Sequence, residues 1–234
     1  SADGFVRSEG CGGIVITNKQ NGFSRCARSK PLKTYANVVI AGVNQDGRSV
    51  TLNAPNGLSQ LQLFQETIRK SNIDPTKVNY IESHGTGTKL GDPIEIDALS
   101  QVYSGKKTYV GSLKNQFGHL EGTAGMISII KSILVLQTGI IPRNPFLEEI
   151  NSNIDFAGNL QPVRDLEIKT STNYAAISSF GFGGTNGHVI LKKCANENNT
   201  VRVQNEFEFR NKNLFFTTDI KNSIKEADMI FISV

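Results

Sequence analysis

Two loops of the sequence combine histidine with residues that could stabilise a developing negative charge. His84 lies in the segment HGTGT, just after an apolar stretch at residues 78–81, and His119 ends the segment SLKNQFGH, which also holds Lys114. Two imidazole Nε2–H donors directed at one carbonyl oxygen stabilise an enolate or oxyanion, and a nearby ammonium can hold the protonation and orientation of one imidazole. This chemistry suits acyl transfer and carbon–carbon bond formation on thioesters.

Each of the three histidines also has a structural alternative, since a single histidine is most often a structural residue. His84 and His119 both follow predicted strands in glycine-containing loops, where sites usually form, whereas we interpret His188, which begins a strand after TNG, as structural. We predict no metal site, because His84 and His119 are 35 residues apart and the chain has no HxH or HExxH motif. A solvated surface lysine is the alternative for Lys114, and the spacing does not decide between the two roles.

The elements that must position these loops alternate between strand and helix patterns. We expect strands at residues 14–16, 38–43, 78–81, 108–111, 175–178 and 189–192, and helices at residues 58–71, 95–103 and 123–137. Gly139 should end the last of these helices. The segment SSFGFGGTNGH lies between the last two strands, which predicts a hairpin that carries a functional turn, with backbone N–H groups able to bind a second oxyanion.

The composition limits the broad class of protein. The 234 residues are 38% hydrophobic and 20% charged, as in an ordinary globular protein. The net charge of +4, from 25 basic and 21 acidic residues, is too small to favour nucleic acid as a partner. Three cysteines without a CxxC pair, no apolar run of membrane-span length and no visible signal peptide favour a cytoplasmic location without a membrane partner.

Three long motifs in this order resemble the β-ketoacyl synthase domain of polyketide synthases and fatty acid synthases: HGTGTKLGDPIEI, VGSLKNQFGHLEGTAG and SSFGFGGTNGH. The segments DGFVRSEGCGG and IPRNPFLEEINSNIDF are also similar to that family, and the resemblance covers roughly residues 1–194. It implies an α/β thiolase-like fold, layered α-β-α-β-α in the whole domain, of which this chain is the C-terminal half. It also implies a homodimer that works with an acyl carrier protein.

The same resemblance implies decarboxylative condensation of a malonyl-type extender unit with an acyl group. His84 and His119 would be the two catalytic histidines that bind the malonyl thioester carbonyl, and Lys114 would be the supporting lysine. Thr86 and Thr88 would hydrogen-bond the phosphopantetheine arm, which belongs to the partner carrier protein. The segment itself would bind no cofactor.

In the glycine turn, the resemblance makes Phe182 the gating aromatic residue. Its backbone N–H, together with Gly183, would form the oxyanion hole. Two smaller departures from the family pattern are Asn115, where a serine usually follows the lysine, and Gly187, where TNGH stands in place of the usual TNAH. Neither departure removes a catalytic side chain.

One departure is larger, because the family's nucleophilic cysteine lies in a DTACSSS-type motif upstream of the DG(F/Y)VR segment, and this chain begins after it. Cys11 lies in the family's GEGCG strand and is interpreted as a small buried apolar residue, while Cys26 and Cys194 match no nucleophile motif. We therefore expect an acyltransferase-type segment that is inactive as this chain. The alternative is a non-catalytic carrier-binding or dimerisation module from a degenerate or chimeric gene.

The end of the chain has a second resemblance. Residues 211–234, NKNLFFTTDIKNSIKEADMIFISV, resemble a strand–helix–strand piece of UDP-glucose 6-dehydrogenase, and residues 195–210 have the composition of a linker. A dehydrogenase-related function would need a GxGxxG fingerprint, which the chain lacks. This tail therefore predicts no activity, and it suggests a chimeric gene model, a fused fragment or a degenerate gene.

Overall fold

A six-stranded mixed sheet forms the centre of the computed structural model, which describes residues 3–16, 34–47, 54–103, 107–156, 159–164 and 167–194. In spatial order its strands are β1 (Ala36–Gln45), β8 (Thr185–Lys193), β7 (Tyr174–Phe180), β2 (Val78–Glu82), β3 (Thr108–Gly111) and β5 (Leu160–Pro162). From β7 to β5 the strands are parallel, whereas β8 is antiparallel to both β7 and β1. A separate antiparallel pair joins β4 (Ile140–Ile141) to β6 (Ile168–Lys169).

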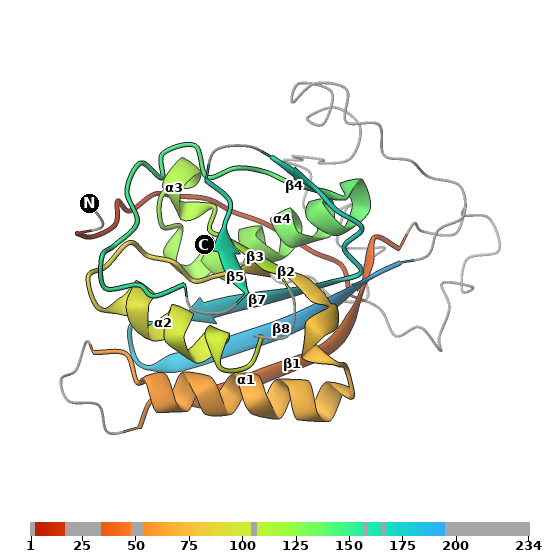
Figure 1. Ribbon diagram of the computed structural model, residues 1–234, viewed down its shortest axis with the longest axis horizontal. Coiled ribbons are helices and arrows are strands. Elements are labelled where there is room, and N and C mark those ends of the chain that lie inside the picture. The colour runs from red at the N-terminus through yellow and green to blue at the C-terminus, as the bar shows by residue number, and fades with distance from the viewer. Residues whose placement is uncertain are drawn as a thin grey trace, which may run out of the picture.

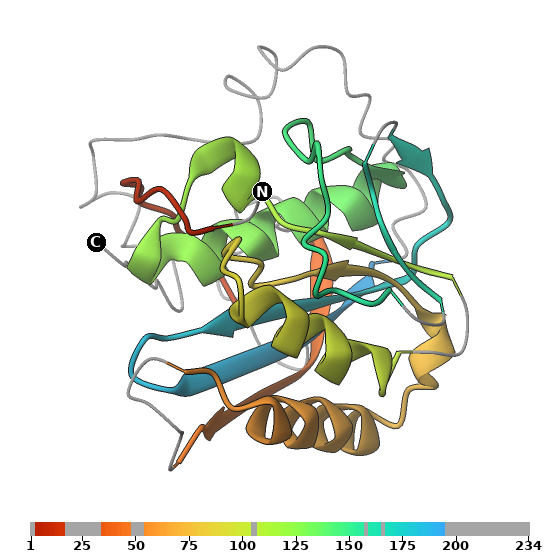
Figure 2. The same cartoon turned by 60° about the vertical axis from the view of Figure 1, so that its left-hand side comes forward.

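Helices cover both faces of the main sheet. The α-helices are α1 (Gly57–Ser71), α2 (Gly91–Ser100), α3 (Lys114–Phe117) and α4 (Ala124–Thr138), and the 3₁₀ turns are η2 (Pro75–Lys77) and η3 (Glu121–Thr123). Figures 1 and 2 show α1 and α2 on one face of the sheet and α4 on the other. The described residues therefore form an α-β-α arrangement.

Alternating strand residues supply a hydrophobic core on each face of the sheet. In β2, Ile81 packs with Phe64 of α1 and Leu99 of α2, while Tyr80 packs with Leu136 of α4 in the opposite core. All of these side chains are fully buried. Burial of each large apolar side chain contributes about 1.5–3 kcal/mol, so the neighbouring residues Tyr80 and Ile81 stabilise both layers at once.

Local sequence signals set the ends of two helices. The side chain of Asn56 accepts hydrogen bonds from the N–H groups of Leu58 and Ser59, at 3.1 and 3.3 Å, and so caps α1. Gly139 follows α4 with φ of 70° and donates its N–H to the carbonyl of Val135. This confirms that Gly139 ends the helix, because a left-handed backbone is best adopted by glycine.

Most of the predicted elements are confirmed, with shifts at their ends. The strand at residues 108–111 matches β3, the helix at 58–71 is α1 with one residue added, and the glycine turn joins β7 to β8 as a hairpin. The helix predicted at 95–103 begins earlier, at Gly91. The strand predicted at 14–16 is wrong: only Val15 forms an isolated bridge, and Val15 and Ile16 are exposed rather than packed in a sheet.

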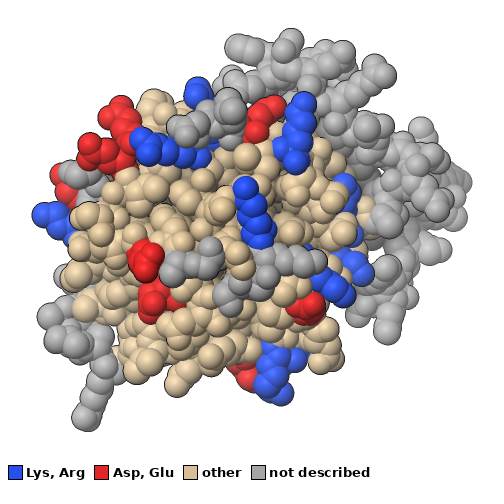
Figure 3. Space-filling view, in the orientation of Figure 1, with Lys and Arg blue, Asp and Glu red and all other residues tan. Residues whose placement is uncertain are grey.

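Surface charge agrees with the mild net charge of the sequence. On the face shown in Figure 3, acidic and basic side chains are interspersed over a largely uncharged surface. Within the described ranges, none of the helices combines the length and the apolar character that a membrane span needs. The predicted linker at 195–210 and the dehydrogenase-like tail at 211–234 lie outside the described residues.

Candidate active site

Parallel strands β2 and β3 deliver the two histidine loops to the same edge of the sheet. Their last residues, Glu82 and Gly111, are register partners. Ser83 donates its N–H to the carbonyl of Gly111 at 2.8 Å, and the hydroxyl of Ser112 donates to the carbonyl of Gly85 at 3.2 Å. The carboxyl ends of neighbouring parallel strands form a common crevice, so the two loops lie side by side.

The rings of His84 and His119 are 5.4 Å apart between centroids and nearly perpendicular, at 83°. Each Nδ1 accepts a backbone hydrogen bond, from Phe180 N–H at 3.3 Å for His84 and from Glu121 N–H at 2.8 Å for His119. In a neutral imidazole with Nδ1 as acceptor, the proton resides on Nε2. Both histidines are therefore set up as Nε2–H donors.

The surroundings keep both imidazoles neutral. Burial holds the pKa of His84 well below its usual value, and the positive charge of Lys114 and the neighbouring His119 lower it further. Burial and Lys114 also lower the pKa of His119, against the opposing effect of Glu121. Neutral imidazoles can donate hydrogen bonds to a developing oxyanion without surrendering a proton.

Lys114, the first residue of α3, does not behave as a solvated surface lysine. Its side chain is half-buried, and burial lowers its pKa, whereas the carboxylates of Glu95, Glu82 and Asp92 raise it. The lysine in turn lowers the pKa of His84. The structure thus brings Lys114 into the electrostatic environment of the two histidines.

Two acidic residues near the start of α2, which the sequence did not single out, hold the His84 loop. The carboxylate of Glu95 accepts the N–H of His84 at 2.7 Å and of Gly85 at 2.9 Å. Asp92 accepts the N–H of Gly87 with both oxygens, at 3.0 and 3.1 Å. Burial raises the pKa of Glu95 to about 7. Their three-residue spacing within DPIEI, on one face of a helix, is the signal that could have identified them.

The hydroxyls of Thr86 and Thr88 lie next to each other in the same loop, 3.3 Å apart. Thr88 also accepts the N–H of Gly91 at 3.0 Å, which joins its side chain to the first turn of α2. Gly87 has φ of 73°, and a Cβ there would lie 2.9 Å from the carbonyl oxygen of Gly4. Only glycine suits this backbone. The turn at Gly87 therefore has one threonine on each side.

At the start of the glycine turn, Phe180 rather than Phe182 contacts His84. The rings of Phe180 and His84 are 5.2 Å apart, while the side chain of Phe182 is 78% exposed. A Cβ at Gly183 would meet no atom within 4 Å, so this part of the turn is open. Phe180 was missed from the sequence because the two phenylalanines in FGFGG can be distinguished only by the register of the hairpin.

The segment at residues 4–8 crosses both loops. Gly4 donates its N–H to the carbonyl of Gly87 at 2.9 Å, and the carbonyl of Val6 accepts the N–H of His119 at 2.7 Å. The ring of Phe5 lies 4.9 Å from that of His119. This segment therefore holds the two loops from outside the main sheet.

His188 lies apart from the other two histidines and is fully buried. Its Nε2 is 2.8 Å from the hydroxyl of Tyr103 and its Nδ1 is 3.1 Å from the hydroxyl of Ser178, while the ring of Phe64 packs against it at 4.6 Å. Burial lowers its pKa to about 3. These contacts agree with its interpretation as a structural residue.

The interpretation of Cys11 as a buried residue is wrong, because its side chain is exposed. An added Cβ at Gly10 would meet Leu120, just before η3, and one at Gly12 would meet Met126, at the start of α4, so both glycines face the same part of the chain. In an extended segment the residue between them points to the opposite side. Cys26 lies outside the described residues.

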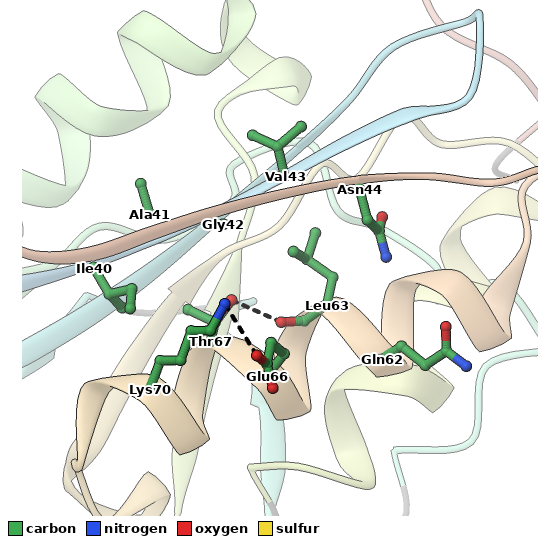
Figure 4. Close-up of a pocket in the computed structure, with 10 residues that line it drawn as sticks. All are labelled: Ile40, Ala41, Gly42, Val43, Asn44, Gln62, Leu63, Glu66, Thr67 and Lys70. Atoms are coloured by element: carbon green, nitrogen blue, oxygen red, sulfur yellow. Dashed lines mark hydrogen bonds and ion pairs between the residues drawn. The ribbon is translucent and has the colours of Figure 1, made fainter.

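Outside the histidine loops, the described residues form no cluster of metal ligands and contain a hollow. Among the described residues, no group of three or more His, Cys, Asp or Glu side chains is arranged to hold a metal ion. A hollow of about 360 Å³ lies between edge strand β1 and helix α1, and the pair Glu66–Lys70 lies at its border (Figure 4). None of the predicted site residues lines this hollow.

Two family models match the chain. The model of the beta-ketoacyl synthase C-terminal domain matches residues 35–148, and that of the ketoacyl-synthetase C-terminal extension matches residues 151–219. The second match extends into the segments interpreted above as a linker and a dehydrogenase-like tail. That interpretation and the domain boundaries stay predictions.

Curated relatives and solved structures give the same family. The chain is 40% identical over 199 residues to a phenolphthiocerol/phthiocerol polyketide synthase polypeptide of Mycobacterium tuberculosis, a match that covers 82% of this chain and 13% of the relative. A bacillaene synthase module 6 ketosynthase of Bacillus subtilis has a TM-score of 0.67 and 31% identity, covering 70% of this chain and 31% of that one. An oxazolomycin ketosynthase domain of Streptomyces albus has a TM-score of 0.67 and 34% identity, covering 71% and 31%.

The chain therefore belongs to the β-ketoacyl synthase family and contains the C-terminal domain of a polyketide synthase ketosynthase, with a thiolase-like fold. It spans only a small part of the curated relatives it matches, 13% of the mycobacterial synthase named above.

Proposed function

We propose that this chain forms the enolate-stabilising part of a ketosynthase site that condenses malonyl-type units carried on an acyl carrier protein. The observation that carries this proposal is the pair of imidazoles at the ends of β2 and β3. Their rings are 5.4 Å apart, and the Nδ1 of each accepts a backbone N–H, so that both Nε2–H groups can serve one oxygen.

In the proposed reaction, the malonyl thioester oxygen accepts hydrogen bonds from Nε2–H of His84 and of His119. Release of CO₂ leaves an electron pair on the α-carbon, and the charge that spreads to the thioester oxygen is stabilised by these two donors. The α-carbon then attacks an acyl thioester, a carbon–carbon bond forms and a thiolate leaves. Lys114 supports the neutral state of His84, since its charge lowers the pKa of that imidazole.

The partners follow from the same chemistry. Thr86 and Thr88, adjacent at 3.3 Å, would hydrogen-bond the phosphopantetheine arm of the carrier protein, so the chain needs no cofactor of its own. Phe182, exposed at the turn, would gate the acyl group, and its N–H with Gly183 would hold the second oxyanion. A homodimer and a cytoplasmic location belong to this proposal.

The acyl-accepting cysteine motif of the DTACSSS type is not among the 234 residues. We therefore propose that this polypeptide alone does not complete condensation, although it retains the enolate-stabilising groups. The same observation favours the second candidate function, a carrier-binding or dimerisation module without turnover.

The test uses the 234-residue chain with a malonyl-loaded carrier protein, and measures carrier binding, CO₂ release and β-ketoacyl formation separately. We expect binding and slow CO₂ release without condensation. His84→Ala and His119→Ala should each reduce CO₂ release by roughly 10²-fold or more, while the exposed-site control Glu66→Gln should not. Binding without CO₂ release favours the binding module, and the absence of both contradicts both candidates.

A further inference from the structure

Directly beneath the two loops lies the fully buried carboxylate of Glu82, the last residue of β2. Its Oε1 accepts the N–H of Leu113 at 2.7 Å. Its Oε2 lies 2.8 Å from Lys131 Nζ and accepts a hydrogen bond from the hydroxyl of Tyr80. The Lys131 side chain is only 15% exposed, so this ion pair belongs to the interior.

These contacts join three separate parts of the site. Glu82 is two residues before His84, and Leu113 is immediately before Lys114. Lys131 comes from the middle of α4, on the opposite face of the sheet from α1 and α2, and its ammonium also lies 5.7 Å from the centre of the Tyr80 ring. One carboxylate thus holds the strand that presents His84 against the turn that presents Lys114.

Packing alone does not account for these residues. A buried ion pair has a desolvation cost that a pair of apolar side chains would avoid, so its contribution to stability is small or negative. Apolar side chains of the same elements, Ile81, Val135 and Leu136, fill the two cores. A buried carboxylate that accepts two hydrogen bonds and forms an ion pair instead fixes the relative positions of its three partners.

The charge of Glu82 also reaches Lys114. Among the groups around Lys114, the carboxylates of Glu95, Glu82 and Asp92 raise its pKa, whereas burial and Lys131 lower it. Glu82 and Lys131 therefore shift the pKa of Lys114 in opposite directions, as expected for charges in one network.

We propose that Glu82 is a positioning residue of the ketosynthase site, with Lys131 and Tyr80 as its supports. It touches no substrate. It holds the turn before Lys114 against the strand that leads to His84. The position of Lys114 relative to the two imidazoles is thereby fixed. This role rests on the proposed function, because the geometry it maintains is the one assigned to enolate stabilisation.

The experiment compares Glu82→Gln with Glu66→Gln, the same substitution at an exposed ion pair on α1. We measure CO₂ release from the malonyl carrier, binding of the carrier, the melting temperature and the Lys114 Hε–Cε NMR resonance, assigned with Lys114→Arg. Glu82→Gln should reduce the rate of CO₂ release at least about tenfold, through misplacement of the reacting groups. It should leave carrier binding within about threefold and lower the pKa of Lys114. Glu66→Gln should change none of these.

A second pair of variants keeps the proposal testable where Glu82→Gln fails to fold. Tyr80→Phe removes one hydrogen-bond donor to Glu82 and retains the packing. Like Glu82→Gln, it should reduce the rate of CO₂ release. Lys131→Met should raise the pKa of Lys114, opposite to Glu82→Gln. Unchanged rates and an unchanged Lys114 resonance in folded Glu82→Gln would overturn the positioning role. If the unmodified chain releases no CO₂, the proposed function fails, whereas the Lys114 resonance still decides the role of Glu82.

Discussion

The backbone N–H of Phe180 donates to Nδ1 of His84 over 3.3 Å, and their rings lie 5.2 Å apart. This bond links the end of β7 to the loop after β2, although the two residues are 96 positions apart in the chain. Because it comes from the main chain, it does not depend on the side chain at position 180. It assigns the proton of neutral His84 to Nε2, the nitrogen that the proposed reaction uses.

The first prediction concerns the titration of this pair. Since burial and Lys114 lower the pKa of both His84 and His119, both rings should be neutral Nε2–H tautomers at pH 7 and gain a proton only below the usual histidine range. ¹⁵N NMR of histidine-labelled chain, assigned with single-histidine variants, measures this. An imidazolium signal from His84 at pH 7 would contradict the prediction.

A second prediction concerns His188, whose pKa is lowered to about 3 by burial. The unfolded chain binds a proton on this histidine below about pH 6.5 and the folded chain does not, so stability from His188 is lost as the pH falls. Relative to His188→Gln, the unmodified chain should lose about 2 kcal/mol of unfolding free energy between pH 7 and pH 5. Denaturant unfolding at both pH values checks this, and a constant difference would contradict it.

The acidic residues of α2 give a third prediction. Glu95→Ala leaves the N–H groups of His84 and Gly85 without their acceptor, which should cost roughly 1–3 kcal/mol of unfolding free energy. It should also displace the His84 NMR signals. Asp97→Ala, at an exposed position of the same helix, is the matched control and should change stability by less than about 0.5 kcal/mol. Equal effects of the two substitutions would count against a role for Glu95 in holding the loop.

The loop glycines give a fourth prediction. At Gly87 the backbone has φ of 73° and a Cβ would lie 2.9 Å from the carbonyl of Gly4, so Gly87→Ala should cost about 1–3 kcal/mol. At Gly13 an added Cβ would meet no atom within 4 Å, so Gly13→Ala should be close to neutral. Thermal unfolding of the two variants compares them, and a neutral Gly87→Ala would show that the segment at residue 4 does not restrict the loop.

The sequence was sufficient to place the candidate site residues in loops that follow strands, while their catalytic roles stay predictions. His84, Lys114 and His119 each follow a strand that the apolar pattern predicts, and the parallel pairing of β2 and β3 brings these three together. Glu95 was present in a quoted motif, but its role depends on the orientation of α2 relative to the loop, which spacing alone does not define.

Features that depend on tertiary register could not be predicted in the same way. The choice of Phe180 over Phe182 as the neighbour of His84 follows from the pairing of β7 with β8. The exposure of Cys11 follows from the packing of Gly10 against Leu120 and of Gly12 against Met126. The apolar pattern at residues 14–16 predicted a strand, but Val15 forms only an isolated bridge, and the side chains of Val15 and Ile16 are exposed.

The central claim is that His84 and His119 direct two Nε2–H donors at one thioester oxygen. Its most direct test is ¹H–¹⁵N NMR of the imidazoles while a carrier-bound malonyl thioester analogue that cannot lose CO₂ is added. The Nε2–H signals of His84 and His119 should both shift with the same saturation curve, while that of buried His188 stays in place. Carrier binding that leaves the His84 and His119 signals unchanged, or moves only one of them, would contradict the claim.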